Sequence, residues 1–358
     1  MNGRSVAMRG GLATVGVLGA LAAAHALRRI GARVLWPAER DEYRDEDFAL
    51  LDDDPAGIVI ASDGVTLATR TVGPDDAEVT VVFVHGFCNA MEAFHFQRRD
   101  LADRWGDSVR MVFFDQRGHG RSGAPTPESC TVGQLGRDLV SVIEATAPTG
   151  PVVLVAHSLG GMGLLAAAAQ SPEFFASRVA GVALICTAAA EVAGTGIAQV
   201  LSHPVIDGFR LAVRSAPALV RFGRRASKHV VTPILHVSSF HGPVSPTLSR
   251  FTTMMIDRTP VETIEAFLEA IRLHDESAAL PVLAELPVLV LGGAHDMVIP
   301  FVNSRVLAQR LPSAELVRVA DAAHMPQLQF ADEVTDALDR LLVRAGVGAD
   351  AGNEAVGG

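Results

Sequence analysis

Residues 152–161 read V-V-L-V-A-H-S-L-G-G, and this stretch decides the fold. The apolar run Val152–Val155 has the length and composition of a short buried strand, and Leu159–Gln170 has the pattern of a helix. Ser158 therefore stands at a strand-to-helix turn. A turn that presents a nucleophilic serine usually reads G-x-S-x-G. Here Ala156 takes the first glycine position and two glycines close the quoted stretch, so the serine is a candidate nucleophile with one departure from the motif.

Apolar strand patterns alternate with helical patterns on both sides of this turn. We expect strands at residues 58–61, 68–72, 79–85, 109–115, 151–157, 179–186, 287–292 and 314–319, and helices at 93–105, 132–145, 159–170, 301–311 and 326–345. Thr131 is the expected N-cap of the second helix, and Ser62-Asp63-Gly64 is the expected turn of a first hairpin. The alternation predicts an α/β protein with a mostly parallel central sheet and helices on both faces.

Residues 188–284 interrupt this alternation with patterns that are largely helical. Because they lie between two expected sheet strands, we predict a helical cap inserted into a core of residues 55–187 and 285–345. Residues 37–54 are strongly acidic, which indicates a solvated linker. The tail, residues 346–358, is rich in Gly and Ala and is expected to be disordered.

The N-terminal segment, residues 1–36, is apolar and contains Gly10–Leu27, which has no Asp, Glu, Lys or Arg. That length is at the lower end for a membrane span. An uncleaved anchor, a cleaved signal ending near Ala24-His25-Ala26, and an amphipathic or core-docked helix all remain open. Arginines lie on both flanks, so no orientation follows. The sequence leaves a membrane-associated or a cytoplasmic protein open and favours either over a secreted one.

Composition excludes several classes of function. The net charge of −10 over 358 residues argues against a nucleic-acid partner. The three cysteines form no CxxC pair, which favours reduced thiols, and no metalloprotease, Walker or dinucleotide-binding motif occurs. His229, His236 and His241 lie close together but lack further ligands at metal-binding spacing, so we interpret them as scattered histidines. We therefore expect neither a metal nor a cofactor.

Further polar residues follow other expected strands. Asp296 ends the strand before L-G-G-A-H-D, and His324 follows the last strand in A-A-H-M-P. An acid and an imidazole so placed suit a base that removes a serine proton and an acid that orients it, with His295 as a competing histidine. After V-F-V-H-G, the backbone N–H of Phe87 could stabilise an oxyanion together with that of Leu159. Each feature alone is more typical of an ordinary turn or helix cap.

Taken together, these residues resemble the α/β-hydrolase family over residues 55–345, because Ser, Asp and His occur in that chain order at strand ends. The stretch D-Q-R-G-H-G-R-S, residues 115–122, is similar to the turn after the family's fourth strand. The resemblance implies Asp115, Arg117 and His119 as residues that shape the site.

The same resemblance implies roles for the candidate catalytic residues. Ser158 would be the nucleophile, His324 the general base and then acid, and Asp296 its orienting partner, with Phe87 and Leu159 as the oxyanion donors. A serine in the nucleophile position argues against epoxide hydrolases and haloalkane dehalogenases, which resemble this chain in fold but use an aspartate.

We therefore expect a serine esterase or lipase-like enzyme that forms an acyl-enzyme and acts on a hydrophobic small-molecule ester. Thioesterase, lactonase, C–C bond hydrolase and cofactor-free haloperoxidase-like activities would use the same triad and stay open. A catalytically silent hydrolase-fold binding protein is the alternative from another class. Apolar cap residues would line the substrate pocket or form the cap's own core: Phe209, Phe222, Phe240, Phe251, Met254, Met255 and Phe267.

Overall fold

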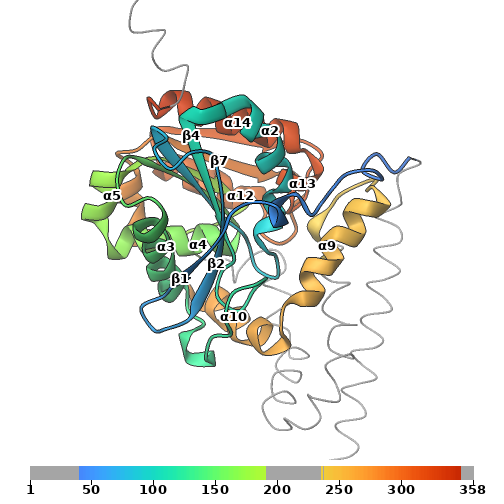
Figure 1. Ribbon diagram of the computed structural model, residues 1–358, viewed down its shortest axis with the longest axis horizontal. Coiled ribbons are helices and arrows are strands. Elements are labelled where there is room, and N and C mark those ends of the chain that lie inside the picture. The colour runs from blue at the N-terminus through green and yellow to red at the C-terminus, as the bar shows by residue number, and fades with distance from the viewer. Residues whose placement is uncertain (1–39, 191–234, 237, 348–358) are drawn as a thin grey trace, which may run out of the picture.

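The computed structural model describes residues 40–190, 235–236 and 238–347. Within this part of the chain, one twisted sheet lies at the centre (Figure 1). Its strands run in the spatial order β1-β2-β4-β3-β5-β6-β7-β8. Their bounds are β1 Ala56–Ile60, β2 Thr66–Val72, β3 Val79–Val84, β4 Val109–Phe114, β5 Val152–His157, β6 Val179–Ile185, β7 Val288–Gly293 and β8 Ala314–Val319.

The sheet is parallel from β4 to β8, and β1 and β2 form the antiparallel hairpin at one edge. This arrangement confirms the predicted fold class and the predicted first hairpin. The central strands β3 and β5 are buried along their whole length, as expected of strands covered on both faces. Parallel strands end at one edge of the sheet, which brings together the loops that follow them.

Helices cover both faces of the sheet (Figure 1). On one face lie α3 (Val132–Thr146), α4 (Leu159–Gln170), α5 (Pro172–Arg178), α11 (Leu280–Leu283) and α12 (Phe301–Arg310). On the other lie α2 (His95–Trp105) and α14 (Ala331–Arg344). Short 3-10 turns occur at Leu50–Asp52, Met91–Phe94, Gly106–Ser108, Pro127–Ser129 and Ser277–Ala279.

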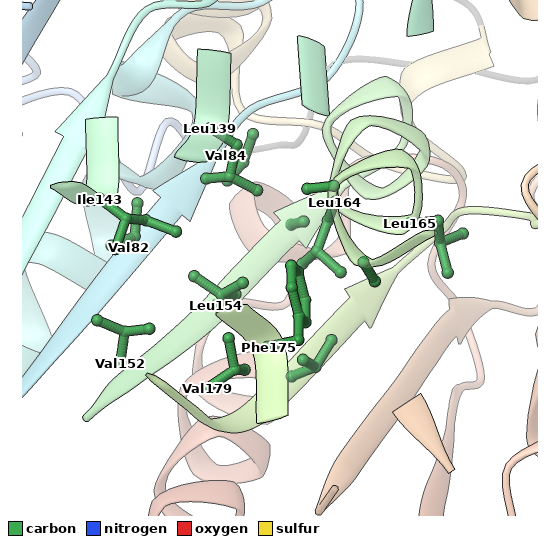
Figure 2. Packing of buried hydrophobic residues seen from close by; sticks show 14 of the residues in the cluster. Val82, Val84, Leu139, Ile143, Val152, Leu154, Leu164, Leu165, Phe175 and Val179 are labelled. Carbon is green, nitrogen blue, oxygen red and sulfur yellow. The ribbon is translucent and has the colours of Figure 1, made fainter. Parts of the chain in front are cut away.

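Aliphatic side chains fill the layer between the sheet and α3, α4 and α5. Figure 2 shows Leu139 and Ile143 of α3 in the same cluster as Val82 and Val84 of β3. Phe175 of α5 is completely buried there. Burying such side chains is the main favourable contribution to folding, about 1.5–3 kcal/mol for each large aliphatic or aromatic group. This layer anchors β3 and β5, whose carboxyl ends carry the candidate site.

Two helical features differ from the sequence prediction. The seven-residue α5 was not predicted, because it is too short to show an amphipathic pattern. The helix predicted at 326–345 is divided into α13 (Pro326–Gln329) and α14. Phe330 has φ −131°, outside the helical region, and its carbonyl accepts the Val334 N–H, so it caps the second piece. By contrast, Thr131 is the N-cap of α3 as predicted, with its Oγ1 3.1 Å from the Gln134 N–H.

The acidic segment was predicted to be a solvated linker, and its described part, residues 40–54, instead packs on the protein. The Glu46 carboxylate lies 2.6 Å from the Arg99 guanidinium of α2, and the Phe48 ring stacks on Phe251 at 4.2 Å. Leu51 is buried. This part differs from the prediction because its charges have arginine partners on the core, and because Tyr43 and Phe48 pack against α2 and the cap.

The insertion at 188–284 is described only in part, and that part is mainly helical, with α9 (Pro246–Arg258) and α10 (Val261–Leu273). The predicted N-terminal segment 1–36, residues 191–234 of the insertion with Phe209 and Phe222, and residues 348–358 of the tail lie outside the described residues. None of the helices that the structure describes is long and apolar enough to cross a membrane.

Candidate active site

The turn between β5 and α4 holds Ser158 in a strained backbone conformation. Its φ is +52° and its ψ −118°, a region that residues other than glycine rarely adopt. The Ser158 N–H donates to the Ile185 carbonyl at 2.9 Å, and the Thr187 hydroxyl donates to the Ser158 carbonyl at 2.8 Å. Neighbouring backbone and side-chain groups therefore fix both polar groups of the strained residue. Strain held in this way is typical of a sharp turn that exposes a serine.

The departure from the glycine motif at Ala156 is accommodated in the sheet. Ala156 is fully buried in β5, where it pairs with Val84 and Leu184. The close approach occurs after the serine, because a Cβ at Gly160 would lie 2.5 Å from the Val84 carbonyl oxygen. At Gly161 it would lie 2.6 Å from the Thr187 side chain. The glycines that this turn requires are therefore the two that the sequence retains.

The structure brings together the serine, histidine and aspartate that the sequence singled out. The Ser158 Oγ lies 2.9 Å from the His324 Nε2, and the His324 Nδ1 lies 2.8 Å from the Asp296 Oδ2. All three residues are buried, at 5–8% exposure. Because the carboxylate only accepts, the Nδ1–H donates to it and the Nε2 accepts the serine hydroxyl proton. This arrangement can remove the proton from the hydroxyl of Ser158.

The second oxygen of Asp296 is fixed by backbone donors. Its Oδ1 accepts the Val298 N–H at 2.8 Å and the Ile299 N–H at 2.9 Å. These bonds hold the carboxylate plane and leave Oδ2 for the imidazole of His324. A carboxylate held in this way keeps its partner in one orientation and one tautomer.

The competing histidine, His295, lies against a different residue. Its ring stacks on His241 of the cap, with centroids 3.7 Å apart, and the side chain is exposed. The neighbouring Asp296, and not His295, makes the hydrogen bond to the His324 Nδ1. His295 therefore lies beside the triad without joining its chain of hydrogen bonds.

The two backbone N–H groups predicted as oxyanion donors belong to Phe87 and Leu159. Phe87 is the third residue after the end of β3, and Leu159 is the first residue of α4. Neither N–H donates a hydrogen bond within the described part of the chain. The contact of Gly160 with the end of β3 brings the two segments that carry these donors close together. Free donors beside a buried serine suit the negative charge of a tetrahedral intermediate.

One group of side chains in the described ranges could hold a metal ion, namely Cys186, Asp296 and His324. The aspartate and the histidine are hydrogen-bonded to each other. Burial, and secondarily the nearby Asp296 charge, raise the pKa of the Cys186 thiol well above its usual range. A thiol that keeps its proton is a poor metal ligand. These residues therefore fit a hydrogen-bonded triad better than a metal centre.

The residues of the D-Q-R-G-H-G-R-S turn bind backbone groups and one another. The Asp115 carboxylate accepts the Met91 N–H at 2.8 Å and the Arg121 N–H at 2.7 Å, and burial raises its pKa to about 6. The His119 Nδ1–H donates to the Arg117 carbonyl at 3.0 Å. Burial lowers the pKa of His119 to about 4. These contacts hold the turn that lies beside the loop of Phe87.

The sequence interpretation passed over one residue next to the nucleophile. The His157 Nε2–H donates to the backbone carbonyl of His324 at 2.8 Å. The available signal was a histidine placed inside an otherwise aliphatic buried strand, where a polar side chain needs a partner.

Comparisons with known proteins identify the fold family. A family model described as alpha/beta hydrolase fold matches residues 79–331. A monoacylglycerol lipase of Mycolicibacterium smegmatis is 26% identical over 71% of this chain and 83% of its own length. A pimeloyl-[acyl-carrier protein] methyl ester esterase of Stenotrophomonas maltophilia is 29% identical over 75% of this chain and 93% of its own.

Solved structures share the fold. A thermophilic esterase from Thermogutta terrifontis superposes with a TM-score of 0.64 at 23% identity, covering 81% of this chain and 99% of that one. An enol-lactonase from Burkholderia xenovorans LB400 gives a TM-score of 0.63 at 23% identity, covering 80% of this chain and 100% of that one. At this level of identity, the likeness concerns the fold.

Proposed function

The chain belongs to the alpha/beta hydrolase fold family, and we propose that it is a serine hydrolase that cleaves hydrophobic carboxylic esters. Its relatives and structural neighbours include esterases and a lipase, and the chain is an enzyme of this esterase- and lipase-like class. The observation that carries the finer proposal is the hydrogen-bonded series from Ser158 through His324 to Asp296.

In the first half of the reaction, the His324 Nε2 takes the hydroxyl proton as the Ser158 Oγ attacks the ester carbonyl carbon. The carbonyl oxygen becomes an oxyanion, which accepts from the N–H groups of Phe87 and Leu159. Asp296 stabilises the imidazolium without taking its proton. Collapse of the intermediate breaks the bond to the alkoxy oxygen, which leaves as the alcohol with the proton from His324.

In the second half, water attacks the acyl-enzyme and gives one proton to the His324 Nε2. The second tetrahedral intermediate uses the same two N–H donors. When it collapses, the proton returns to the Ser158 Oγ and the carboxylic acid leaves. The enzyme is restored with no external oxidant, reductant or cofactor.

The surroundings of the site favour an apolar substrate. Phe267 of α10 is buried in one cluster with Leu159 and Met162, and Phe87 packs against that cluster. A second cluster joins the α9 residues Phe251 and Met255, with Phe240, to the core. Cap residues therefore pack partly among themselves and partly against the candidate site. A neutral ester with hydrocarbon chains suits such a lining better than a charged one.

The experiment that tests this proposal is a series of p-nitrophenyl esters from acetate to palmitate, assayed with wild-type protein and Ser158→Ala. We expect turnover by the wild type, a maximum at a medium or long acyl chain, and background rates for the variant. A thioester, a lactone and a C–C bond substrate in the same assay separate the other triad chemistries. Turnover that persists in Ser158→Ala would contradict the proposal, and no turnover of any substrate would favour a silent binding protein.

From the sequence alone, we also propose that residues 1–36 associate with membranes, since Gly10–Leu27 is uncharged. Fractionation of cells that produce the full chain or a chain beginning at Pro37 tests this. The full chain is expected in the membrane fraction and the shorter chain in the soluble fraction. Identical behaviour of the two chains would contradict the proposal.

A further inference from the structure

The side chain of His157 links the two loops that carry the candidate nucleophile and base. It lies at the end of β5, directly before Ser158, and is fully buried. Its Nε2–H donates to the backbone carbonyl of His324 at 2.8 Å, and the two imidazole rings have centroids 4.9 Å apart. His157, the residue before Ser158, therefore holds the backbone of His324, whose side chain contacts Ser158.

The other edge of the His157 ring lies against the turn after β3. A Cβ at Gly86 would lie 2.6 Å from the His157 Nδ1 and 3.1 Å from the Ser158 Cβ. Gly86 directly precedes Phe87, the proposed oxyanion donor. The ring therefore fills the space between the oxyanion turn and the base loop, and only a residue without a side chain fits at position 86 beside it.

The contacts of His157 assign its proton. Nε2 faces a carbonyl, so this nitrogen carries the hydrogen, and Nδ1 has no hydrogen-bond partner among the described residues. Burial, and secondarily the nearby His324, lower the pKa of His157 well below its usual range. The ring is neutral, so it adds no positive charge beside His324 when that residue becomes an imidazolium.

We propose that His157 is a positioning residue that holds the His324 loop at hydrogen-bonding distance from Ser158. This inference rests on the proposed function, because His157 can position His324 for catalysis only if Ser158 and His324 carry out the proposed reaction. The hydrogen bonds that the imidazole makes with Ser158 and Asp296 orient the ring, but neither fixes the backbone that carries it. The bond from His157 supplies that third constraint. Displacement of a reacting group by about 1 Å costs about 100-fold in rate.

The test compares His157→Leu, which removes the N–H donor, with His157→Gln, which keeps an N–H at a similar reach. We expect kcat for a p-nitrophenyl ester to fall about 10- to 100-fold in the leucine variant, with KM changed by less than about threefold. The glutamine variant should recover most of kcat. His95→Leu is the matched control, because it removes another buried histidine, which contacts Glu46 rather than the triad. It should keep the wild-type kcat.

Equal kcat in wild type and His157→Leu would overturn the proposal, and so would an equal loss in the leucine and glutamine variants. If the leucine variant does not fold, 15N NMR of histidine-labelled wild-type protein decides. A neutral ring with the proton on Nε2 supports the proposal, whereas a proton on Nδ1 overturns it. Ser158→Ala separates the two claims, because its full activity would contradict the proposed reaction and leave the NMR result on His157 unchanged.

Discussion

The turns after β4 and β5 lie on either side of β3 at the same edge of the sheet, and both contain buried polar side chains. In the turn after β4, the Arg117 guanidinium binds both oxygens of Asp138 at 2.6 Å and also binds Asp63. In the turn after β5, Ser158 is the first residue of one series of hydrogen bonds, which runs through His324 to Asp296.

The difference between the two turns lies in how their polar groups are satisfied. The guanidinium of Arg117 meets two carboxylates, and its hydrogen bond holds the pKa of Asp63 below the usual value. The Arg117 guanidinium keeps its protons, because arginine stays protonated in proteins. The Ser158 hydroxyl faces the His324 Nε2, which can accept its proton. Buried charge that is fully paired maintains structure, whereas a hydroxyl beside an oriented base can react.

The largest effect should follow from removal of the base. His324→Gln keeps a polar side chain but cannot accept and return the proton, so kcat should fall by roughly 10⁶-fold. Unfolding by urea should show nearly wild-type stability. Ester hydrolysis measured with purified protein checks the prediction, and a variant that retains more than a hundredth of the activity would contradict it.

A smaller loss should follow from a change in the orienting acid. In Asp296→Asn, the amide can donate to the Nδ1 and stabilise the wrong tautomer of His324, so kcat should fall by roughly 10⁴-fold. KM should change little, because Asp296 is buried behind the histidine. Steady-state kinetics check this, and an unchanged kcat would show that the hydrogen bond to Asp296 has no role in the reaction.

A substitution in the turn after β4 should change the free energy of unfolding rather than kcat. Arg117→Leu leaves the Asp138 carboxylate buried without its charged partner and should lower the free energy of unfolding by about 3–5 kcal/mol. The folded fraction should keep kcat within a few-fold of the wild type. Arg104→Leu is the control, because its ion pairs with Asp336 and Asp339 lie on the surface and contribute about 1 kcal/mol or less. Similar losses in the two variants would contradict the distinction.

Low pH should lower the free energy of unfolding because the buried histidines bind protons more readily in the unfolded chain. Burial lowers the pKa of His85 to about 3 and that of His119 to about 4, so each binds a proton in the unfolded chain before it does in the folded one. Their contribution to stability is therefore lost as pH falls from about 6.5 to about 4 for His119 and to about 3 for His85. Asp115, whose pKa is raised to about 6 by burial, acts in the opposite direction and offsets one of them.

The variant His119→Phe tests whether His119 lowers the stability as pH falls. It removes one titrating group, so the fall in unfolding free energy between about pH 6 and pH 5 should be smaller by about 1.4 kcal/mol per pH unit. Urea unfolding across this range measures the slope. An identical slope in the wild type and the variant would contradict the account of His119.

The sequence predicted the sheet and the candidate triad because their signals are local. Each strand is a short apolar run, and Ser158, Asp296 and His324 each follow such a run. A parallel sheet places those ends at one edge. What the sequence did not predict depends on partners far along the chain. Glu46 binds an arginine 53 positions away, and His157 binds a carbonyl 167 positions away, so no local pattern marks either contact.

The most direct test of the central claim is labelling of folded protein with a fluorophosphonate, followed by peptide mass spectrometry. We predict one label for each chain, attached to the Oγ of Ser158, because that hydroxyl lies 2.9 Å from the His324 Nε2. Labelling should be absent in Ser158→Ala and strongly slowed in His324→Gln. Folded wild-type protein that stays unlabelled, or that carries the label on another residue, would contradict the account.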